Sequence, residues 1–198
     1  MRSAPTWIAV LGTLAVLLPL ILGALGKRRA ERQLPDAAAA LGLERDGPQG
    51  ARQQGRYKGQ IGGRRVIVRP DTFGMIRVGF ESRPALSLST DPAAVAVIED
   101  VAPFETGDAA FDRLFRHRLA SAEVAELLRT NERLRQRLVD FSKSHSLRSF
   151  AVDAEYVTIT GKVYAFFHYI PADRLEPLIA DLVALADAIE PELGGAPL

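Results

Sequence analysis

The sequence predicts an α+β fold in which an N-terminal transmembrane helix precedes an antiparallel sheet with two amphipathic helices packed on one face. Three observations predict it. Residues 7–26 are apolar and uncharged, several short β-branched or alternating segments are separated by Gly, Pro and Asp, and two longer segments repeat apolar residues with a helical period. The order strands, helix, strands, helix is typical of an α+β layer.

Residues 7–26 form the candidate membrane helix, because twenty residues without a charge are long enough to cross a hydrocarbon core. A cleaved signal peptide is the alternative. It fits less well, since only Arg2 precedes the run and Lys27, Arg28 and Arg29 follow it directly. The excess of basic residues behind the run predicts a single-pass protein of the inner membrane with a cytoplasmic C-terminal domain.

Residues 27–50 are expected to be a polar juxtamembrane connector with a short Ala-rich helix, and residues 51–198 a single α+β domain. The domain should open with a β-hairpin, because two strand-like segments flank the turn Ile61-Gly62-Gly63. The Val- and Ala-rich segment 93–101 suits either helix or strand. The strands predicted in this half are residues 56–60, 64–69, 75–81 and 85–89.

Two helices and three strands are predicted in the second half. Ser121 is the expected N-cap of a helix to about Phe141, in which Asn131 would take a heptad position if the helix formed a coiled coil; packing on the sheet is the preferred interpretation. A capping pattern at Asp173 and Glu176 starts the last helix, which runs to about residue 190. The strands are residues 148–152, 156–160 and 163–169, with the last two joined at Gly161-Lys162.

The chain has 198 residues, 25 Lys+Arg, 24 Asp+Glu, three His and no Cys. The absence of cysteine excludes disulfide scaffolds, iron–sulfur clusters and thiol nucleophiles, so His and carboxylates are the remaining candidate metal ligands. Nucleotide-binding and hydrolase motifs are missing from the sequence, and we expect no cofactor.

The segment 104–117 contains the densest group of chemically capable side chains. Asp108, Asp112 and His117 could form a metal or acid/base site, but no ligand spacing brings them together. The preferred interpretation is structural, with a Thr-Gly-Asp turn and with Phe111 and Phe115 in the core. We therefore expect no catalytic residue here.

The run from Thr106 to Phe115, T-G-D-x-x-F-D-x-x-F, together with an A-x-x-L-G-L stretch at Ala38 to Leu43 and a G-x-x-x-G at Gly55 to Gly59, resembles a group of bacterial proteins, often membrane-anchored, with a T-G-D-x-x-F-D core motif. The similarity extends over most of the chain behind the apolar run. That group has no assigned activity, so the resemblance implies a shared kind of domain and no catalytic residues.

Charge is divided unevenly along the chain. Residues 27–83 contain 13 Lys+Arg and 6 Asp+Glu, whereas residues 84–198 contain 11 and 18. The basic half could rest against anionic lipid or meet an acidic protein partner, or it could be only the solvated face of the hairpin. Basic residues are not interleaved with enough aromatic residues to predict nucleic-acid binding. The candidate surface residues are Lys27, Arg28, Arg29, Arg32, Arg56, Lys58, Arg64 and Arg65.

The leading functional hypothesis is a membrane-anchored, non-catalytic interaction or scaffold domain. Two alternatives stay open: a domain that binds a lipid or another apolar ligand, and a hydrolase or metal enzyme that uses Asp108, Asp112 and His117. The predicted partners are the membrane, through residues 7–26, and an anionic lipid or protein.

Overall fold

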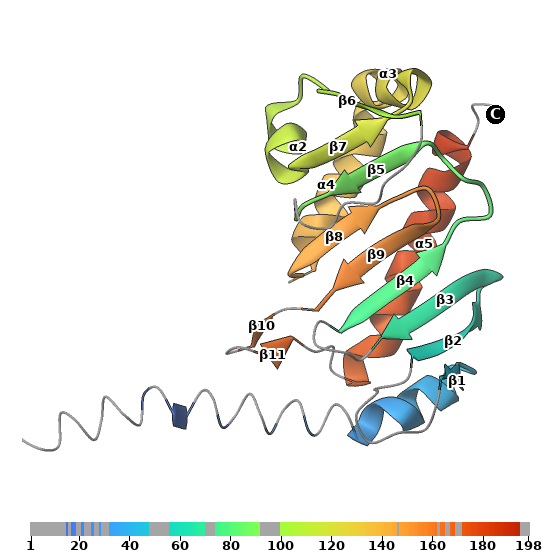
Figure 1. The fold of residues 1–198 in the computed structure, drawn as a ribbon, viewed down its shortest axis with the longest axis vertical. Coiled ribbons are helices and arrows are strands. Elements are labelled where there is room, and N and C mark those ends of the chain that lie inside the picture. Colours follow the sequence, from blue (N-terminus) through green and yellow to red (C-terminus); the bar gives the residue numbers. More distant parts are fainter. Residues whose placement is uncertain are drawn as a thin grey trace, which may run out of the picture.

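The computed structural model of the chain describes residues 32–47, 56–69, 74–91, 100–145, 147–161 and 172–194, the backbone of 163–164 and 167–168, and a few single residues between 15 and 28. Within this part the fold is α+β, and its largest element is a nine-stranded sheet in which every neighbouring pair is antiparallel (Figure 1). In sheet order the strands are β1 (Glu44–Asp46), β2 (Arg56–Ile61), β3 (Arg64–Arg69), β4 (Met75–Gly79), β9 (Tyr156–Thr160), β8 (Ser149–Val152), β5 (Leu86–Ser89), β7 (His117–Ala120) and β6 (Ala102–Pro103).

The centre of the sheet is a hairpin that comes late in the chain. β8 and β9 lie between β4 and β5, so two strands that follow each other in the sequence are separated in the sheet by a later hairpin. The register pairs Ile76 with Ile159 and Phe150 with Ile159, which aligns apolar side chains across the three strands. A shift of one residue would move this apolar set to the opposite face, so burial specifies the register.

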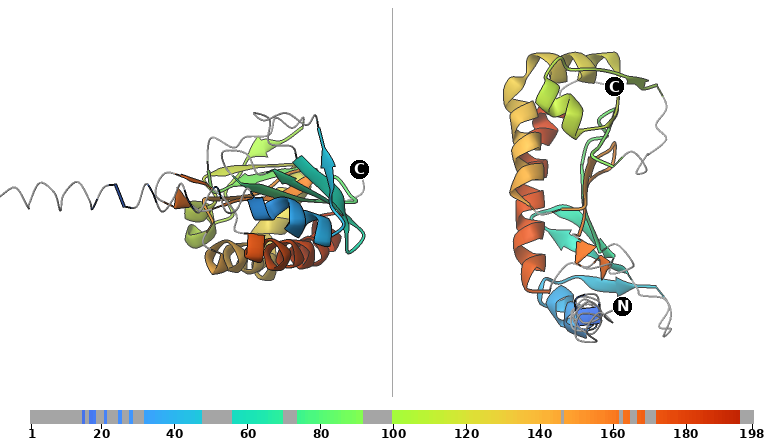
Figure 2. Two further views of the ribbon diagram at one scale, coloured as in Figure 1. Left: turned by 90° about the horizontal axis from the view of Figure 1, so that it is seen from below. Right: turned by 90° about the vertical axis from the view of Figure 1, so that its left-hand side faces the viewer.

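Helices cover one face of this sheet (Figure 2). The two longest pack against each other, and the last one also contacts β4. Each buries one apolar side, as the helical period predicted. The helices are α2 (Ala109–Leu114), α3 (Ala122–Thr130), α4 (Glu132–Ser144), the 3-10 turn Ala172–Arg174 and α5 (Leu175–Leu193).

The helix predicted from Ser121 to Phe141 is two helices, with the break at Asn131. Asn131 has backbone angles outside the helical range, φ −92° and ψ 86°, and its Oδ1 accepts a hydrogen bond from Leu134 N–H at 2.9 Å. This is the geometry of an N-cap. Asn131 therefore ends α3 and begins α4, which explains its position better than a coiled-coil seam does.

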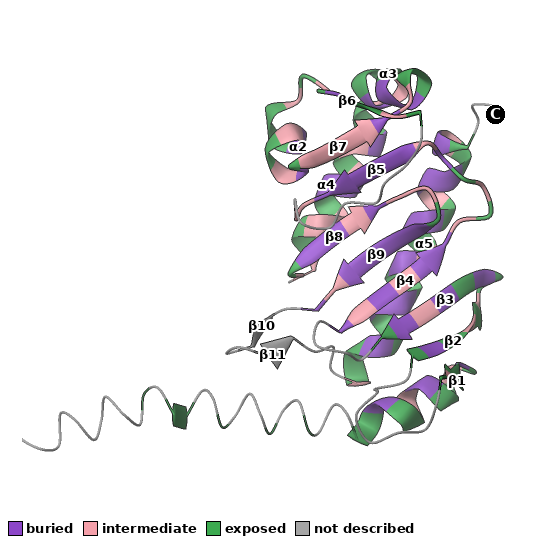
Figure 3. Ribbon diagram, viewed as in Figure 1, coloured by how far each residue is buried: buried purple, intermediate pink, exposed green. Residues whose placement is uncertain are grey.

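The core lies between the sheet and the helices, and Figure 3 shows buried residues along β4, β9, β8 and β5 and on the inner side of α5. The apolar residues that recur with the helical period along α5 are buried: Leu175, Leu178, Ile179, Leu182, Leu185 and Ile189. At about 25 cal/mol per Å² of apolar surface, this layer is the main stabilising contribution to the domain.

The domain begins earlier in the chain than the sequence predicted. Residues 32–40 are helical, and Leu34, Ala38 and Leu43 belong to the core. β1 pairs with β2 and so extends the sheet by one strand. Much of the predicted connector is thus part of the folded layer.

The transmembrane prediction for residues 7–26 is wrong for the described part of the chain, in which no helix is both long and apolar enough to cross a membrane. The predicted single-pass inner-membrane location with a cytoplasmic domain, which depends on that helix, is therefore not supported either. The longest described helix, α5, carries five carboxylates along 19 residues and is amphipathic, and the helix 32–40 turns its apolar side into the domain. Most of residues 7–26 lie outside the described residues.

A second difference concerns the strand predicted over residues 163–169. β10 (Val163–Tyr164) and β11 (Phe167–His168) pair with each other in a separate two-stranded sheet, whereas β9 pairs with β4 and β8. The central position of β9 leaves no edge for a third partner. The segment 93–101 lies outside the described residues except for its last two positions.

Candidate functional site

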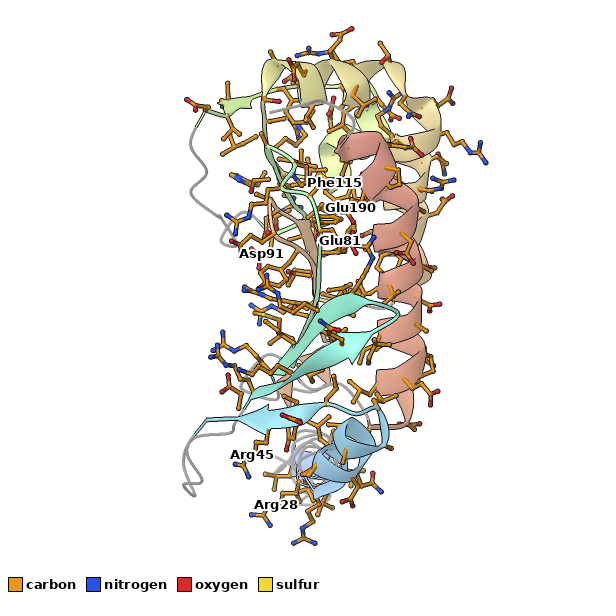
Figure 4. The ribbon with its side chains drawn as sticks, turned by 90° about the vertical axis from the view of Figure 1, so that its right-hand side faces the viewer. Arg28, Arg45, Glu81, Asp91, Phe115 and Glu190 are labelled. Carbon is orange, nitrogen blue, oxygen red and sulfur yellow. The ribbon has the colours of Figure 1, made fainter. Side chains whose placement is uncertain are left out.

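The sheet face that turns away from α4 and α5, here called the outer face, carries most of the basic side chains of the first four strands. Arg64 reaches α5, so by strand alternation Arg65 and Arg69 lie on the outer face. The register then places Lys58, which is paired with Ile67, and Arg77, also paired with Ile67, on the same face. No helix of the described residues covers this face, and Figure 4 shows nitrogen-tipped side chains projecting from it.

Together with Arg56, which is two residues before Lys58 on β2 and shares its face, these four residues form a group on three adjacent strands, called the basic cluster below. Its members are Arg56, Lys58, Arg65, Arg69 and Arg77. Neighbouring strands lie about 4.8 Å apart, so the cluster concentrates positive charge over a short distance.

Carboxylates near the basic cluster are shared rather than matched one to one. Asp46 lies 2.6 Å from Arg56 Nε and 3.4 Å from Lys58 Nζ. The hydrogen bond from Arg56, helped by Lys58, holds the pKa of Asp46 below its ordinary value. Glu155 is likewise shared by Arg65 at 3.9 Å and Arg83 at 3.7 Å. Among the described residues, these two carboxylates are therefore shared by four cations.

The basic cluster is organised around one aromatic ring. The guanidinium carbons of Arg65 and Arg77 lie 4.7 and 5.4 Å from the ring centre of Tyr156, within the range of cation–π contacts. Gly79 makes this possible, because it stands between Arg65 and Tyr156 in the same cross-strand row. A Cβ at Gly79 would lie 3.3 Å from Arg65 Cβ and 3.5 Å from its Nε.

Hydroxyl groups continue the outer face from β9 to β5. Thr158 pairs with Arg77 on one side and Ala151 on the other, and Ser89 follows beside Ala151. Thr158 is 9% exposed, and its Oγ1 has no hydrogen-bond partner within the described part of the chain. Polar groups this deeply buried normally have a partner.

Arg64 is the predicted surface residue that the structure places elsewhere. Its side chain is only 8% exposed and lies between the sheet and α5, where it meets Asp187 Oδ1 at 2.5 Å and Glu190 Oε2 at 2.6 Å. Figure 4 shows Glu190 on the inner side of the sheet. The prediction was wrong for Arg64 because Ile61-Gly62-Gly63 sets the strand phase, and the phase puts Arg64 and Arg65 on opposite faces.

The other surface candidates divide by position. Arg56, Lys58 and Arg65 lie on the outer face as exposed residues, and Arg28 and Arg32 are exposed on the N-terminal segment. Lys27 and Arg29 lie outside the described residues.

Asp108 and Asp112 shape the turn before α2 instead of meeting His117 in a site. Asp108 Oδ1 caps α2 by accepting the N–H groups of Ala110 and Phe111, and the hydrogen bond from Phe111 contributes most to a lowered pKa of Asp108. Asp112 accepts hydrogen bonds from the backbone and hydroxyl of Thr106.

Each member of that predicted trio has a different neighbour. Asp108 pairs with Arg135, Asp112 with Arg118, and His117 Nε2 lies 3.2 Å from Ser87 Oγ. No group of three potential metal ligands exists among the described residues. Phe111 and Phe115 are fully buried with ring centres 4.7 Å apart, which confirms their predicted place in the core.

Two surface hollows lie among the described residues. The first, of about 530 Å³, lies between the chain after β4, the start of α3 and the end of α5; acidic Glu81, Asp100 and Glu123 line it beside a few apolar side chains. The second, of about 590 Å³, lies beside β7, where Arg118 and Arg129 are already engaged by backbone carbonyls. Neither brings catalytic groups together.

Sequence reasoning missed Arg77 and Tyr156, the residues around which the outer face is organised. Arg77 alternates with apolar Ile76 and Val78, so it was recognisable as a residue of the solvent side. The contact of Arg77 with Tyr156 was not recognisable from the sequence, because β4 and β9 are about 80 residues apart and their register follows only from the three-dimensional pairing.

No protein-family model matches the sequence, and no curated protein matches it. Among solved structures, the chain is similar to the crystal structure of the mycobacterial trehalose monomycolate transport factor A, TtfA, with 11% identity and a TM-score of 0.46 over 86% of this chain and 97% of that chain. At this identity and score the likeness carries no argument about function. The motif resemblance noted above stays a prediction.

Proposed function

We propose that this chain is a non-catalytic interaction domain that binds an acidic polypeptide through the basic cluster. The observation that carries the proposal is the concentration of basic side chains on β2, β3 and β4, where Asp46 and Glu155 are each shared by two described cations. Exposed ion pairs of this kind contribute little stability, so the cluster has little value for the fold itself. Its excess charge can instead attract and orient an acidic partner.

The shape of the surface favours a polypeptide over a flat lipid layer. A sheet twists, so its side chains follow a curved row instead of lying in one plane. An extended acidic chain, which presents alternate side chains every ~6.8 Å on one side, can follow such a row. A bilayer can contact only the most protruding groups.

An apolar ligand has less support on this face. Among the described residues, the large apolar side chains that are exposed are Leu17, Leu18, Ile21 and Leu25, all in the N-terminal segment. The hollow beside α3 is rimmed by carboxylates, which oppose an anionic lipid. The enzyme alternative has no gathered site, since Asp108, Asp112 and His117 each bind a different neighbour.

The test uses the full chain and polyglutamate as the acidic probe. A double variant, Lys58→Glu with Arg77→Glu, reverses charge in the cluster. The control, Arg113→Glu with Arg133→Glu, makes the same change in net charge at exposed positions on α2 and α4. The dissociation constant is measured at several salt concentrations.

We expect the cluster variant to weaken polyglutamate binding at least tenfold, and the control to change it less than twofold. Affinity of the unchanged chain should fall steeply with salt, because exposed charges are screened beyond about 8 Å at physiological ionic strength. If both variants lost the same affinity for polyglutamate, binding would depend on net charge alone, and the proposal would be overturned. Binding to phosphatidylserine vesicles without binding to polyglutamate would overturn the choice of a polypeptide.

A further inference from the structure

We infer that Arg65, Arg77 and Tyr156 form a site for a phosphate group carried by the acidic partner. The inference rests on the proposed function and specifies its chemistry. Three separate features of the outer face support it: the two guanidinium groups held on one ring and, within the described residues, the missing counter-charge of Arg77 and the unpartnered hydroxyl of Thr158.

The ring of Tyr156 lies within cation–π distance of two positive charges. The two guanidinium carbons can be separated by no more than the sum of their distances to the ring centre, 4.7 and 5.4 Å. Like charges at this distance repel each other. The ring stabilises each cation through its face, but it leaves N–H groups at the guanidinium edges for an anion.

The charge of Arg77 is not balanced within the described residues. Its Nε–H donates to Met75 Sδ at 3.1 Å, and a thioether is a weak acceptor. Among the described carboxylates, Arg65 meets Glu155 at 3.9 Å, which Arg83 also approaches. An external anion would supply the counter-charge that the described residues do not provide for Arg77.

Thr158 adds a neutral donor beside these cations. It is the cross-strand partner of Arg77 and lies two residues after Tyr156 on the same face of β9. Leaving its hydroxyl buried without a partner is unfavourable. The hydroxyl oxygen has almost no exposed surface, so a bound oxyanion accepts its hydrogen bond only after the side chains over it move aside.

A phosphate monoester suits this group better than a carboxylate does. It carries a charge of about −1.5 to −2 at pH 7 and three strong acceptor oxygens, enough for two guanidinium edges and one hydroxyl at once. A carboxylate has one charge and two oxygens. The site would thus discriminate a phosphorylated acidic segment from one that is only acidic.

The first test is a titration of the full chain with inorganic phosphate, with acetate at equal ionic strength as the comparison. The signals followed are the arginine Nε–H resonances in NMR spectra. We expect saturable shifts of Arg65 and Arg77 with phosphate and none with acetate. Arg77→Gln should weaken phosphate binding at least tenfold, whereas Arg45→Gln, an exposed residue whose register places it on the opposite face, should change it less than twofold.

Thr158→Val separates a binding role from a structural one. The change removes the unpartnered hydroxyl and keeps the shape of the side chain, so the melting temperature should stay equal or rise. Phosphate affinity should nevertheless fall about three- to tenfold. A variant with unchanged phosphate affinity would remove Thr158 from the site, and shifts spread evenly over all arginines would overturn the site itself.

A peptide that carries phosphoserine between glutamates, compared with the same peptide carrying serine, distinguishes this inference from the proposed function. Tighter binding of the phosphorylated peptide supports both the phosphate site and the proposed function, provided that the difference between the two peptides disappears in Arg77→Gln. Equal binding of the two peptides overturns the phosphate site and leaves the acidic-partner function standing. If neither peptide binds, the phosphate site and the acidic-partner function are both contradicted. If only phosphatidic acid vesicles bind, the phosphate belongs to a lipid, and the polypeptide is overturned as its source.

Discussion

Arg64 Nη1 lies 2.6 Å from Glu190 Oε2, and this pair joins the start of β3 to the last turns of α5 with side chains only 8% and 10% exposed. The same guanidinium group donates to the carbonyl of Gly79 at 3.1 Å, and Glu190 also accepts the backbone N–H of Ser82. Burying two charges is costly, but here each group has further hydrogen-bond partners that offset the cost.

Removing Arg64 should therefore destabilise the domain strongly. Arg64→Ala leaves the Glu190 carboxylate buried without its cation, and we expect a loss of about 3 to 5 kcal/mol in the free energy of unfolding. Urea denaturation of the full chain measures this loss. Arg45→Ala, at an exposed position of β1, should change stability by less than about 0.5 kcal/mol. Similar values for the two variants would contradict the role of the buried pair.

The same pair predicts how stability depends on pH. Burial alone would raise the pKa of Glu190, but the hydrogen bonds from Ser82 and Arg64 outweigh it and hold the pKa below the ordinary value of 4.5. A carboxylate with a lowered folded-state pKa adds stability above its unfolded pKa, and this stability is lost as the pH falls through the folded value. We expect the melting temperature to decrease below about pH 4.5 and Glu190→Gln to make that decrease shallower. An identical pH profile in the variant would refute the linkage.

Phe111 is the next expected source of large stability changes. It is fully buried beside Phe115, so Phe111→Ala should leave a cavity and cost about 3 to 5 kcal/mol. Asp108→Asn provides the comparison within the same motif, because asparagine also caps a helix and should cost far less. Calorimetric melting of both variants gives the difference. An unchanged melting temperature for Phe111→Ala would show that the ring is not a core anchor.

Asn131 has two functions that different substitutions can separate. Its Oδ1 caps α4, and its Nδ2 donates to Glu192 Oε2 at 2.5 Å. Asn131→Ala removes both and should cost about 1 to 2 kcal/mol. Asn131→Asp keeps the cap but places a carboxylate against Glu192, so its instability at pH 7 should be relieved by adding Glu192→Gln. If the double variant melts at the same temperature as Asn131→Asp alone, the contact of Asn131 with Glu192 on α5 contributes nothing to stability.

The sequence was sufficient to predict those features that depend on residues close together in the chain. Ser121 caps α3 as predicted, and the apolar period located the buried side of α5. Asn131 was ambiguous, because a heptad position and a helix cap use the same residue type. The break at Asn131 follows from its non-helical backbone, which the period of the flanking leucines does not reveal.

The candidate site could be predicted only in part, because it depends on strand phase and on distant pairing. Whether Arg64 or Arg65 faces the helices is decided by the hairpin turn, and an error of one residue exchanges a buried ion pair for a surface charge. The contact of Arg77 with Tyr156 depends on β9 lying beside β4. No local pattern in either strand specifies this neighbour.

The late hairpin at the centre of the sheet also constrains the order of assembly. Until residues 149–160 have left the ribosome, β4 and β5 each have an unpaired edge, and the strands on the two sides cannot join into one sheet. Pairing over such long sequence separations is slow, and open strand edges promote association between chains. The nascent protein therefore passes through a stage in which the edges of β4 and β5 are open to pairing with another chain. A chain that ends before β8 retains these unpaired edges.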